Sequence, residues 1–412
     1  MDVMAGHVIV GASLAGASAA GTLREEGYDG PVVLLGAERT VPYERPPLSK
    51  EYLMGSKELE AAYVHPPAWY VEHDIDLRLG AEVVGIDRDA GAVTLADGGT
   101  VGYDRLLLTT GASPRRLPVE GADLDGVHTL RTADDAVTLR GLLADGGRRL
   151  VVIGSGWIGL EVAAAGRTHG NEVVVVEQED TPLKVALGAE LGAAFGALHR
   201  EHGVDLRLSS GVRRITGTGG HVTGVELADG STVPADDVLV AIGAAPNVDL
   251  ARTAGLAVAD GIRVDAALRT ADPRVFAAGD VASADHPLAG IPVRTEHWAN
   301  ALNGGPAAAR SMLGQDVSYD RLPYFFTDQY DLGMEYSGFG ALAGDARLVY
   351  RGDRDGREFV VFWVDRAGRV VAGMNVNVWD QTDAIQALVR RSFAAPVDVD
   401  RLGDPAVPLA EL

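Results

Sequence analysis

The chain has 412 residues, a formal net charge of −22 and no cysteine. A chain of this length exceeds what one hydrophobic core supports, so two or three domains are expected. The acidic balance argues against nucleic-acid binding, which needs a basic surface, and we attribute it mainly to solubility. Without cysteine, neither thiol–disulfide chemistry nor the thiolates that usually hold iron–sulfur clusters can reside in this chain.

The apolar runs predict buried strands and no membrane span. The longest of them have strand length, well short of the ~20 residues that a transmembrane helix needs. The amino terminus leads directly into the first expected strand, without a basic segment followed by an apolar one. This pattern favours a cytoplasmic location.

The first predicted unit begins with an apolar strand at residues 7–10 that ends in a glycine-rich turn, Gly11 to Gly16. In such a turn the first glycine permits a tight reversal, the second lets the backbone approach a pyrophosphate, and the third lets the helix pack on the strand. Ser13 stands in place of the second glycine, where a small hydroxyl fits if the phosphates lie further out, or donates a hydrogen bond itself. Glu38, 27 residues after Gly11, is the expected ribose ligand.

A second apolar strand ends in a similar turn, Gly154-Ser-Gly156-Trp-Ile-Gly159, which begins 143 residues after the first. An alanine-rich helix and another strand follow, as a βαβ unit requires. Glu177, 23 residues after Gly154, has the spacing of an acid that binds an adenosine ribose. No basic residue directly follows it, so the unit is expected to prefer NAD(H) over NADP(H). Two dinucleotides in one chain imply electron transfer between them.

Further strand-to-glycine breaks follow the two turns. The strand at residues 275–278 ends in Gly279-Asp280, where the carboxylate can reach a ribityl hydroxyl of a flavin. Gly111 and Gly243 end strands where the chain is expected to cross between domains. Together these breaks are more specific for a flavoprotein than either glycine-rich turn alone.

With the segments 42–50, 294–300 and 323–330, these motifs resemble the bacterial ferredoxin reductases of the putidaredoxin reductase and biphenyl dioxygenase reductase type, which are FAD-dependent pyridine nucleotide oxidoreductases. The resemblance spans essentially the whole chain. It implies an α/β fold with two Rossmann-like dinucleotide-binding domains in a glutathione-reductase-like arrangement, followed by a C-terminal α+β domain.

The domain organisation implied by the resemblance is discontinuous. Its segments are 1–113 and 242–322 for FAD, 114–241 for NAD, and 323–412 for the C-terminal domain. The sequence supports the last boundary independently, because the βαβ rhythm stops after Asp320 and residues 358–364 and 369–373 have the period-two pattern of an antiparallel sheet. Residues 380–393 have the pattern of an amphipathic helix.

The resemblance also assigns residues to the site. Lys50 is expected near N5 of the flavin and paired with Glu161, Glu296 near the nicotinamide carboxamide, and Trp298 as a wall of the flavin site. These four are the candidate catalytic residues, and Lys50 and Trp298 are also expected to touch the cofactor. The other candidate cofactor-binding residues are Gly11, Ser13, Ala15, Gly16, Glu38, Arg45, Thr110, Gly111, Arg131, Gly154, Gly156, Ile158, Gly159, Glu177, Lys184, Gly243, Gly279, Asp280, His297 and Phe326.

Several assignments have an alternative explanation. Arg45 and Lys50 could be solvated loop residues, and Glu161 could be a first-turn acid that stabilises its helix dipole. Lys184, where relatives usually carry Arg, either contacts cofactor phosphates or is simply solvated. His297 is assigned to packing or to hydrogen bonding at the flavin edge. The ten histidines show no ligand-like spacing, so no metal site is expected.

Phe326 departs from the resemblance, because relatives commonly carry Trp here, near the exposed edge of the flavin. Phe still provides an apolar stacking surface that excludes water. A role that needs an indole N–H or an easily oxidised ring is therefore not expected of Phe326, and core packing explains this residue equally well.

The implied activity is that of a ferredoxin reductase with non-covalent FAD and with NAD(H) as substrate. Its partner would be an external iron–sulfur ferredoxin that serves a cytochrome P450 or a ring-hydroxylating dioxygenase, and nothing in the sequence chooses between these two. Arg310, Arg390 and Arg391 are candidate docking residues, although each could be a solvated helix residue. A monomer or weak homodimer is expected.

Two alternative functions remain open. A rubredoxin reductase shares every motif and differs only in its partner surface. An NADH-sensing flavoprotein like apoptosis-inducing factor would form a long-lived charge-transfer complex and release electrons slowly. A quinone-reducing dehydrogenase is disfavoured, because residues 407–412 do not form a basic amphipathic membrane helix.

Overall fold

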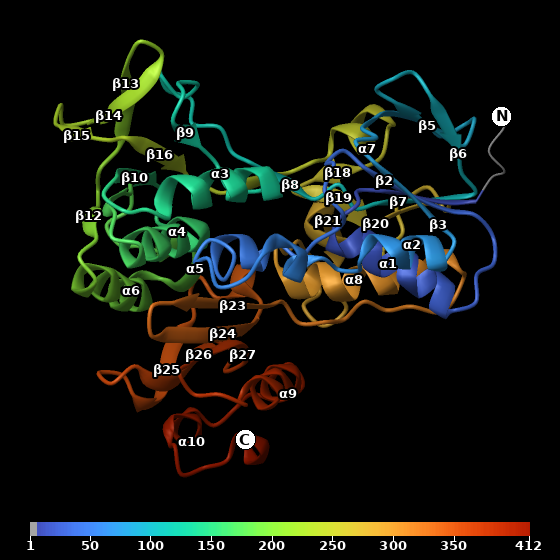
Figure 1. Cartoon of the computed structure of the whole chain (residues 1–412). Helices are drawn as coiled ribbons and strands as arrows, with labels where there is room; N and C mark the ends of the chain where they lie inside the picture. The colour runs from blue at the N-terminus through green and yellow to red at the C-terminus, as the bar shows by residue number, and fades with distance from the viewer. Residues whose placement is uncertain (1–5) are drawn as a thin grey trace.

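The computed structural model describes residues 6–412 and contains two five-stranded parallel sheets (Figure 1). The first sheet has the strand order β20-β7-β1-β2-β3. Its strands are β1 (His7–Val10), β2 (Val32–Gly36), β3 (Ile75–Leu79), β7 (Arg105–Leu108) and β20 (Val275–Ala277). β1 and β2 are almost entirely apolar and buried along their whole length, as expected for parallel strands that are covered on both faces.

The second parallel sheet is formed by chain segments that lie between β7 and β20 in the sequence. It has the order β12-β11-β10-β16-β9. Its strands are β9 (Val127–His128), β10 (Arg149–Ile153), β11 (Glu172–Val176), β12 (Asp205–Arg207) and β16 (Asp237–Val240). The first sheet is therefore assembled from both sides of an insertion, and β20 pairs with β7 across it.

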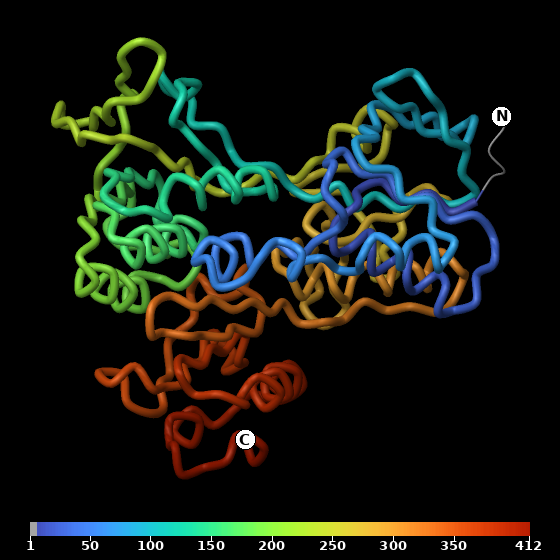
Figure 2. The backbone as a smooth tube through the Cα atoms, in the orientation of Figure 1, coloured from blue at the N-terminus to red at the C-terminus, as the bar shows by residue number. Residues whose placement is uncertain are grey.

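Helices lie against the two parallel sheets. α1 (Leu14–Glu25), α2 (Pro67–Glu72) and α8 (Trp298–Met312) contact the first sheet, and α4 (Trp157–Thr168) and α6 (Ala189–Glu201) contact the second. The other helices of this part are α3 (Ala133–Leu143), α5 (Lys184–Leu187), which contacts α6, and α7 (Asp249–Thr253), which contacts the strand Val83–Asp87 outside the parallel sheets. α1 and α8 pack against each other, so that the blue and orange segments of the backbone run side by side (Figure 2).

Smaller sheets extend the two units. β17 (Ala244–Pro246) pairs with β8 (Ala112–Pro114) where the chain crosses between the parallel sheets. The others are β4 (Val83–Asp87), β5 (Ala92–Leu95) and β6 (Thr100–Gly102); β13 (Val212–Thr218), β14 (His221–Leu227) and β15 (Thr232–Pro234); and β18 (Val258–Ala259), β19 (Gly261–Val264), β21 (Ala282–Asp285) and β22 (Pro292–Val293).

The C-terminal part is an antiparallel sheet with the order β23-β24-β27-β26-β25. Its elements are β23 (Tyr324–Gln329), β24 (Leu332–Gly338), β25 (Arg347–Asp353), β26 (Glu358–Val364), β27 (Val370–Val376), α9 (Thr382–Ser392) and α10 (Val399–Gly403). The expected strands and the expected terminal helix are present. Figure 1 shows this sheet beneath α4, α5 and α6.

Both faces of the C-terminal sheet are covered, which explains why β26 is apolar and buried from Phe359 to Val364 and does not alternate with period two as expected. Val361 and Trp363 belong to a buried cluster that includes Phe195 of α6. Phe362 belongs to another that includes Leu388 of α9. Successive side chains of a strand point to opposite faces, so each face of β26 meets a different apolar surface.

The predicted fold class is confirmed by these sheets. The three segment boundaries at 113, 241 and 322 stay predictions, and the first five residues of the segment 1–113 lie outside the described residues. Between residues 6 and 412, no helix is both long and apolar enough to cross a membrane.

Candidate active site

One cavity of about 1090 Å³ receives both glycine-rich turns and the first strand of the C-terminal sheet. Most of the predicted site residues line it, although they are widely separated in the sequence. These are Gly11, Ser13, Ala15, Glu38, Arg45, Lys50, Thr110, Gly111, Arg131, Gly156, Ile158, Glu161, Gly243, Gly279, Asp280, Glu296, His297, Trp298 and Phe326. Gly16, Gly154, Gly159, Glu177 and Lys184 do not line it.

The glycines outside the cavity wall have a packing role. Gly154 has φ +103°, and a Cβ there would lie 2.4 Å from the carbonyl oxygen of Ala241. A Cβ on Gly159 would lie 2.2 Å from Gly154 O, so the helix can rest on the turn only without a side chain. A Cβ on Gly156, by contrast, would meet no atom within 4 Å. The free space lies where a pyrophosphate would approach the turn, so the turn fits a dinucleotide.

Ser13 occupies the position in the first turn that Gly156 holds in the second. It is the N-cap of α1, in extended backbone (φ −128°, ψ −165°), and its side chain makes no capping hydrogen bond. Gly156 is the N-cap of α4 in similar extended backbone. The serine therefore needs no glycine-like conformation, and its hydroxyl remains available beside the cavity.

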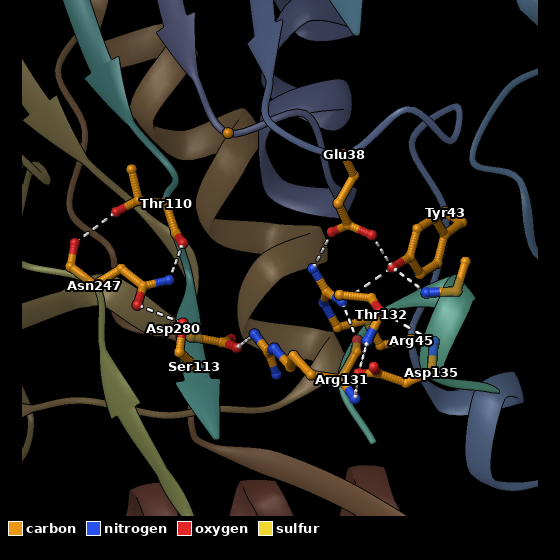
Figure 3. A network of polar contacts seen from close by, with 12 residues as sticks. Glu38, Tyr43, Arg45, Thr110, Ser113, Arg131, Thr132, Asp135, Asn247 and Asp280 are labelled. Atoms are coloured by element: carbon orange, nitrogen blue, oxygen red, sulfur yellow. Dashed lines mark hydrogen bonds and ion pairs between the residues drawn. The ribbon is translucent and has the colours of Figure 1, made fainter. Parts of the chain in front are cut away.

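We call the part of the cavity next to the first glycine-rich turn its first half, and the part next to the second turn its second half. A network of polar side chains lies along the first half (Figure 3). Glu38 accepts hydrogen bonds from the Tyr43 hydroxyl at 2.5 Å and from Arg45 Nη2 at 3.1 Å. Arg45 also donates to the backbone carbonyl of Arg131. Burial raises the pKa of the Tyr43 phenol above its usual range, so this hydroxyl stays protonated and donates. Tyr43 was not among the predicted site residues.

Arg131 and Asp280 join opposite sides of the cavity. Arg131 Nη2 lies 2.8 Å from Asp280 Oδ2. A capping box of Thr132 and Asp135 begins α3 directly after Arg131, and the Asp135 carboxylate also accepts from the Arg131 backbone N–H. Arg131 Nε is buried and has no partner among the described residues. A free guanidinium donor at this wall fits an anionic ligand.

Hydrogen bonds of Asn247 hold together the two chain segments that cross between the parallel sheets. Its Nδ2 donates to the carbonyl of Thr110 at 2.8 Å, and the Thr110 hydroxyl donates to the Asn247 carbonyl at 2.9 Å. The Ser113 hydroxyl donates to Asn247 Oδ1 at 2.8 Å (Figure 3). Asn247 follows the break at Gly243 in the sequence, but its reciprocal pairing with Thr110 became evident only in the structure.

The acid of the second unit faces its own turn. Glu177 Oε2 accepts from the Ser155 backbone N–H at 2.8 Å and from the Ser155 hydroxyl at 2.7 Å. Lys184 lies between Glu179 and Asp180, at 3.0 and 3.2 Å, and these two acids raise its pKa. In this structure the lysine is therefore bound by acids and does not face the cavity.

A buried ion pair lies between the two halves of the cavity. Lys50 Nζ is 2.8 Å from Glu161 Oε1, so the expected pair is present. Lys50 follows a short 3-10 turn, η1 (Pro46–Ser49), and Glu161 lies on α4. Glu161 is 4 % exposed and also accepts from the hydroxyls of Ser49 at 2.5 Å and Thr327 at 2.6 Å. Such added hydrogen bonds are what a buried ion pair requires.

Glu296 and the aromatic residues line the same region. Arg294 donates to Glu296 and also lies 2.9 Å from Asp260. Trp298 opens α8 and meets Phe326 edge to face, with ring centroids 6.4 Å apart. The indole Nε1 of Trp298 is buried without a partner among the described residues.

His297 is part of an aromatic stack. Its ring lies 4.5 Å from that of Phe325, which in turn stacks on Tyr336 at 5.0 Å. Burial lowers the pKa of His297 to about 4, so the ring is neutral at neutral pH. Phe325, a residue that sequence reasoning missed, also contacts Trp157 beside the second turn.

The three arginines predicted for docking each have partners within the chain. Arg310 lies 2.7 Å from Glu26, and Arg390 lies 3.0 Å from Asp320. Arg391 donates to the carbonyl of Leu409 at 2.8 Å.

The fold and the site together define a two-dinucleotide oxidoreductase, and comparison with known proteins identifies the family. Residues 6–305 match the pyridine nucleotide-disulphide oxidoreductase model, and residues 324–412 match the reductase C-terminal model. The chain belongs to the pyridine nucleotide-disulphide oxidoreductase family, and its relatives include proteins named ferredoxin–NAD(+) reductase.

Similar proteins align over more than four fifths of their length. Rhodocoxin reductase of Rhodococcus erythropolis is 43% identical over 86% of this chain and 82% of its own. The ferredoxin–NAD(+) reductase component of the anthranilate 1,2-dioxygenase system of Burkholderia cepacia is 42% identical over 98% of both chains. In the covalent putidaredoxin reductase–putidaredoxin complex, one chain superposes with a TM-score of 0.94 at 35% identity, covering 99% of this chain and 98% of that one. The predicted resemblance is thereby confirmed.

Proposed function

We propose that this protein is an NADH-dependent, FAD-containing ferredoxin reductase that passes electrons to an iron–sulfur ferredoxin serving a cytochrome P450 or a ring-hydroxylating dioxygenase. The single observation that carries the proposal is that both glycine-rich turns open into one cavity, with the Lys50–Glu161 pair between them. The names of the related reductases supply the partner class.

The first half of the cavity would hold FAD. The turn from Gly11 to Gly16 offers the N-terminus of α1 to the phosphates, and Glu38 offers its carboxylate to the ribose. Arg131, with its free Nε, and Asp280 would serve the phosphates and the ribityl chain. When bound, the flavin accepts a hydride and releases electrons singly, which is chemistry that the protein side chains lack.

The second half would hold NADH. The open space at Gly156 accepts the pyrophosphate, and Glu177 accepts the ribose hydroxyls. The acids Glu177, Glu179 and Asp180 would repel a 2′-phosphate, and Lys184 is already neutralised by two of them. The unit therefore favours NADH over NADPH.

The chain's own residues orient the reaction. Lys50 places a cation at the boundary between the two halves, held there by Glu161, and Trp298 and Phe326 exclude water from the same region. Glu296, fixed by Arg294, offers its carboxylate to the nicotinamide carboxamide. These roles require positioning and electrostatics and no covalent attachment.

Docking of the ferredoxin is assigned to the surface arginines Arg310, Arg390 and Arg391. Arg310 and Arg390 have exposed ion pairs, with 44% and 37% of their side chains accessible. Solvent screens exposed pairs of this kind, so an acidic partner can exchange for Glu26 or Asp320 at small cost. We expect a monomer or weak homodimer before docking.

Anaerobic stopped-flow mixing tests the proposal. The yellow protein should bleach rapidly with NADH and slowly with NADPH, and an oxidised two-iron ferredoxin should then reoxidise it. Faster reoxidation by rubredoxin than by ferredoxin would favour a rubredoxin reductase. A persistent long-wavelength absorption band that no iron–sulfur acceptor discharges would contradict the proposal and favour a sensor.

A further inference from the structure

A buried chain of hydrogen bonds leads away from the Lys50–Glu161 pair into the protein. Thr327 Oγ1 lies 2.6 Å from Glu161 Oε1, and Gln329 Nε2 lies 3.2 Å from Thr327 Oγ1. Gln329 Oε1 then lies 2.8 Å from His199 Nε2. The exposed fractions are 1% for Thr327, 1% for Gln329 and 0% for His199, so water does not supply these bonds.

The donors and acceptors on these side chains fix the direction of this hydrogen-bond chain. The Glu161 carboxylate can only accept, so the Thr327 hydroxyl donates to it and accepts from the Gln329 amide N–H. The amide oxygen of Gln329 then faces His199, which must donate from Nε2. His199 is therefore the neutral Nε2–H tautomer. Burial lowers its pKa to about 4, which agrees with a neutral ring.

This hydrogen-bond chain connects three elements that are distant in the sequence. Glu161 lies on α4 and His199 on α6, both beside the second parallel sheet. Thr327 and Gln329 are two residues apart on β23, so both point to the face of the C-terminal sheet that packs on these helices. β23 contacts α4, and Figure 1 shows it below that helix.

An interface that needed only cohesion could have been apolar at these positions. Buried polar groups are stabilising only when paired, and removing one partner leaves the next unsatisfied. Here each hydrogen bond of the chain donates in the direction of the Glu161 carboxylate. That carboxylate pairs with Lys50, the cation of the proposed hydride-transfer site.

We infer that Thr327, Gln329 and His199 are positioning residues that orient Glu161, and through it Lys50, so that the C-terminal sheet forms part of the hydride-transfer machinery. This inference rests on the proposed function. Thr327 holds one oxygen of the carboxylate, Gln329 holds the Thr327 hydroxyl, and His199 prevents the Gln329 amide from turning over.

The test compares matched variants of the FAD-loaded protein. Thr327→Val keeps the shape of the side chain and removes the hydroxyl, whereas Thr327→Ser keeps the hydroxyl. We expect Thr327→Val to slow flavin reduction by NADH about tenfold, the loss expected for one hydrogen bond to a charged group, with the Kd for NADH changed less than about twofold. Thr327→Ser should restore most of the rate.

A second pair of variants tests the far end of the chain. His199→Leu removes the donor and should slow reduction about threefold, because the effect passes through two further hydrogen bonds. His199→Gln, whose amide nitrogen can replace Nε2, should behave like the wild type. Ser392→Ala is the control, since this buried hydroxyl at the end of α9 bonds, among residues 6–412, only to the carbonyls of Val370 and Val389.

A spectroscopic measurement tests the direction of the chain without turnover. In protein labelled with ¹⁵N-histidine, the signal that disappears in His199→Gln should show the neutral Nε2–H tautomer at pH 7. The opposite tautomer would overturn the inference. So would a Thr327→Val variant that NADH reduces at the wild-type rate, or equal slowing by Val and Ser. If NADH fails to reduce even the wild type, the proposed function fails, and this inference fails with it.

Discussion

The two glycine-rich turns share a backbone design but differ in what holds the acid that follows each of them. Glu38 is bound by Tyr43 and Arg45, and Arg45 reaches on to the backbone of Arg131. Glu177 is bound by Ser155 of its own turn. The first acid is therefore embedded in a network drawn from distant segments, whereas the second belongs to a local and self-contained motif.

This difference matches two kinds of ligand. A network built from several segments is completed only in the folded protein and suits a cofactor that remains bound. A local motif whose neighbours are exposed suits a ligand that enters and leaves at every turnover. Ile158 of the second turn and Val185 of α5 both line the cavity and are 40% and 93% exposed, which leaves that half of the cavity open to solvent.

The largest expected effect concerns the backbone design that both turns share. Gly154→Ala should destabilise the protein by roughly 3 kcal/mol or more, because the position has a positive φ and the new Cβ would clash with Ala241 O. Gly156→Ala should leave stability nearly unchanged, since its Cβ would meet open space, but should weaken NADH binding. Urea unfolding of both variants checks this. Equal destabilisation would contradict the division into packing and binding glycines.

The second prediction concerns the distributed network. Asp280→Ala should weaken FAD binding roughly 10- to 100-fold, the range expected when a charged hydrogen-bond partner is lost and Arg131 is left unpaired. The flavin content of purified protein and its dissociation on dilution measure this. Asp236→Ala, which removes a half-buried partner of Arg149 beside the second sheet, is the control and should retain FAD. Full retention of FAD in Asp280→Ala would contradict the assignment.

The third prediction concerns Glu177 and the nucleotide site beside the second turn. Glu177→Ala should raise the Kd for NADH about tenfold and reduce discrimination against NADPH, because the ribose loses its acceptor and a 2′-phosphate loses a repelling charge. FAD content should not change. Titration of the oxidised protein with each nucleotide measures both affinities. Unchanged NADH affinity would remove Glu177 from the ribose site.

The smallest effect is expected at Ser13. Ser13→Gly restores the usual glycine, and because Ser13 already has ordinary extended backbone, stability should change by no more than about 0.5 kcal/mol. A loss of FAD affinity would show that the hydroxyl donates to the cofactor. Unchanged affinity would show that the serine is merely tolerated.

The sequence predicted those parts of the site that depend on local patterns. The glycine turns and the break at Gly279 follow from spacing within one βαβ unit or one strand, and Gly11, Gly156 and Gly279 line the cavity. The ribose role of Glu177, which rests on the same kind of spacing, stays a prediction. Lys50 and Glu161 were paired through the family resemblance, and the structure contains that pair. Thr327, Tyr43 and Phe325 were missed, because no short motif distinguishes a buried hydroxyl or ring that contacts the site from one that only packs.

By itself, the sequence determined the two dinucleotide-binding units, the antiparallel character of the C-terminal part and the absence of cysteine chemistry, since each depends on composition or on short-range periodicity. The tertiary structure decided which distant side chains meet. It brought β20 beside β7, Arg131 to Asp280, and Thr327 and His199 into one chain with Glu161. Those contacts depend on how whole sheets pack against one another. Residue spacing along the chain predicts single elements and turns, but it does not predict that packing.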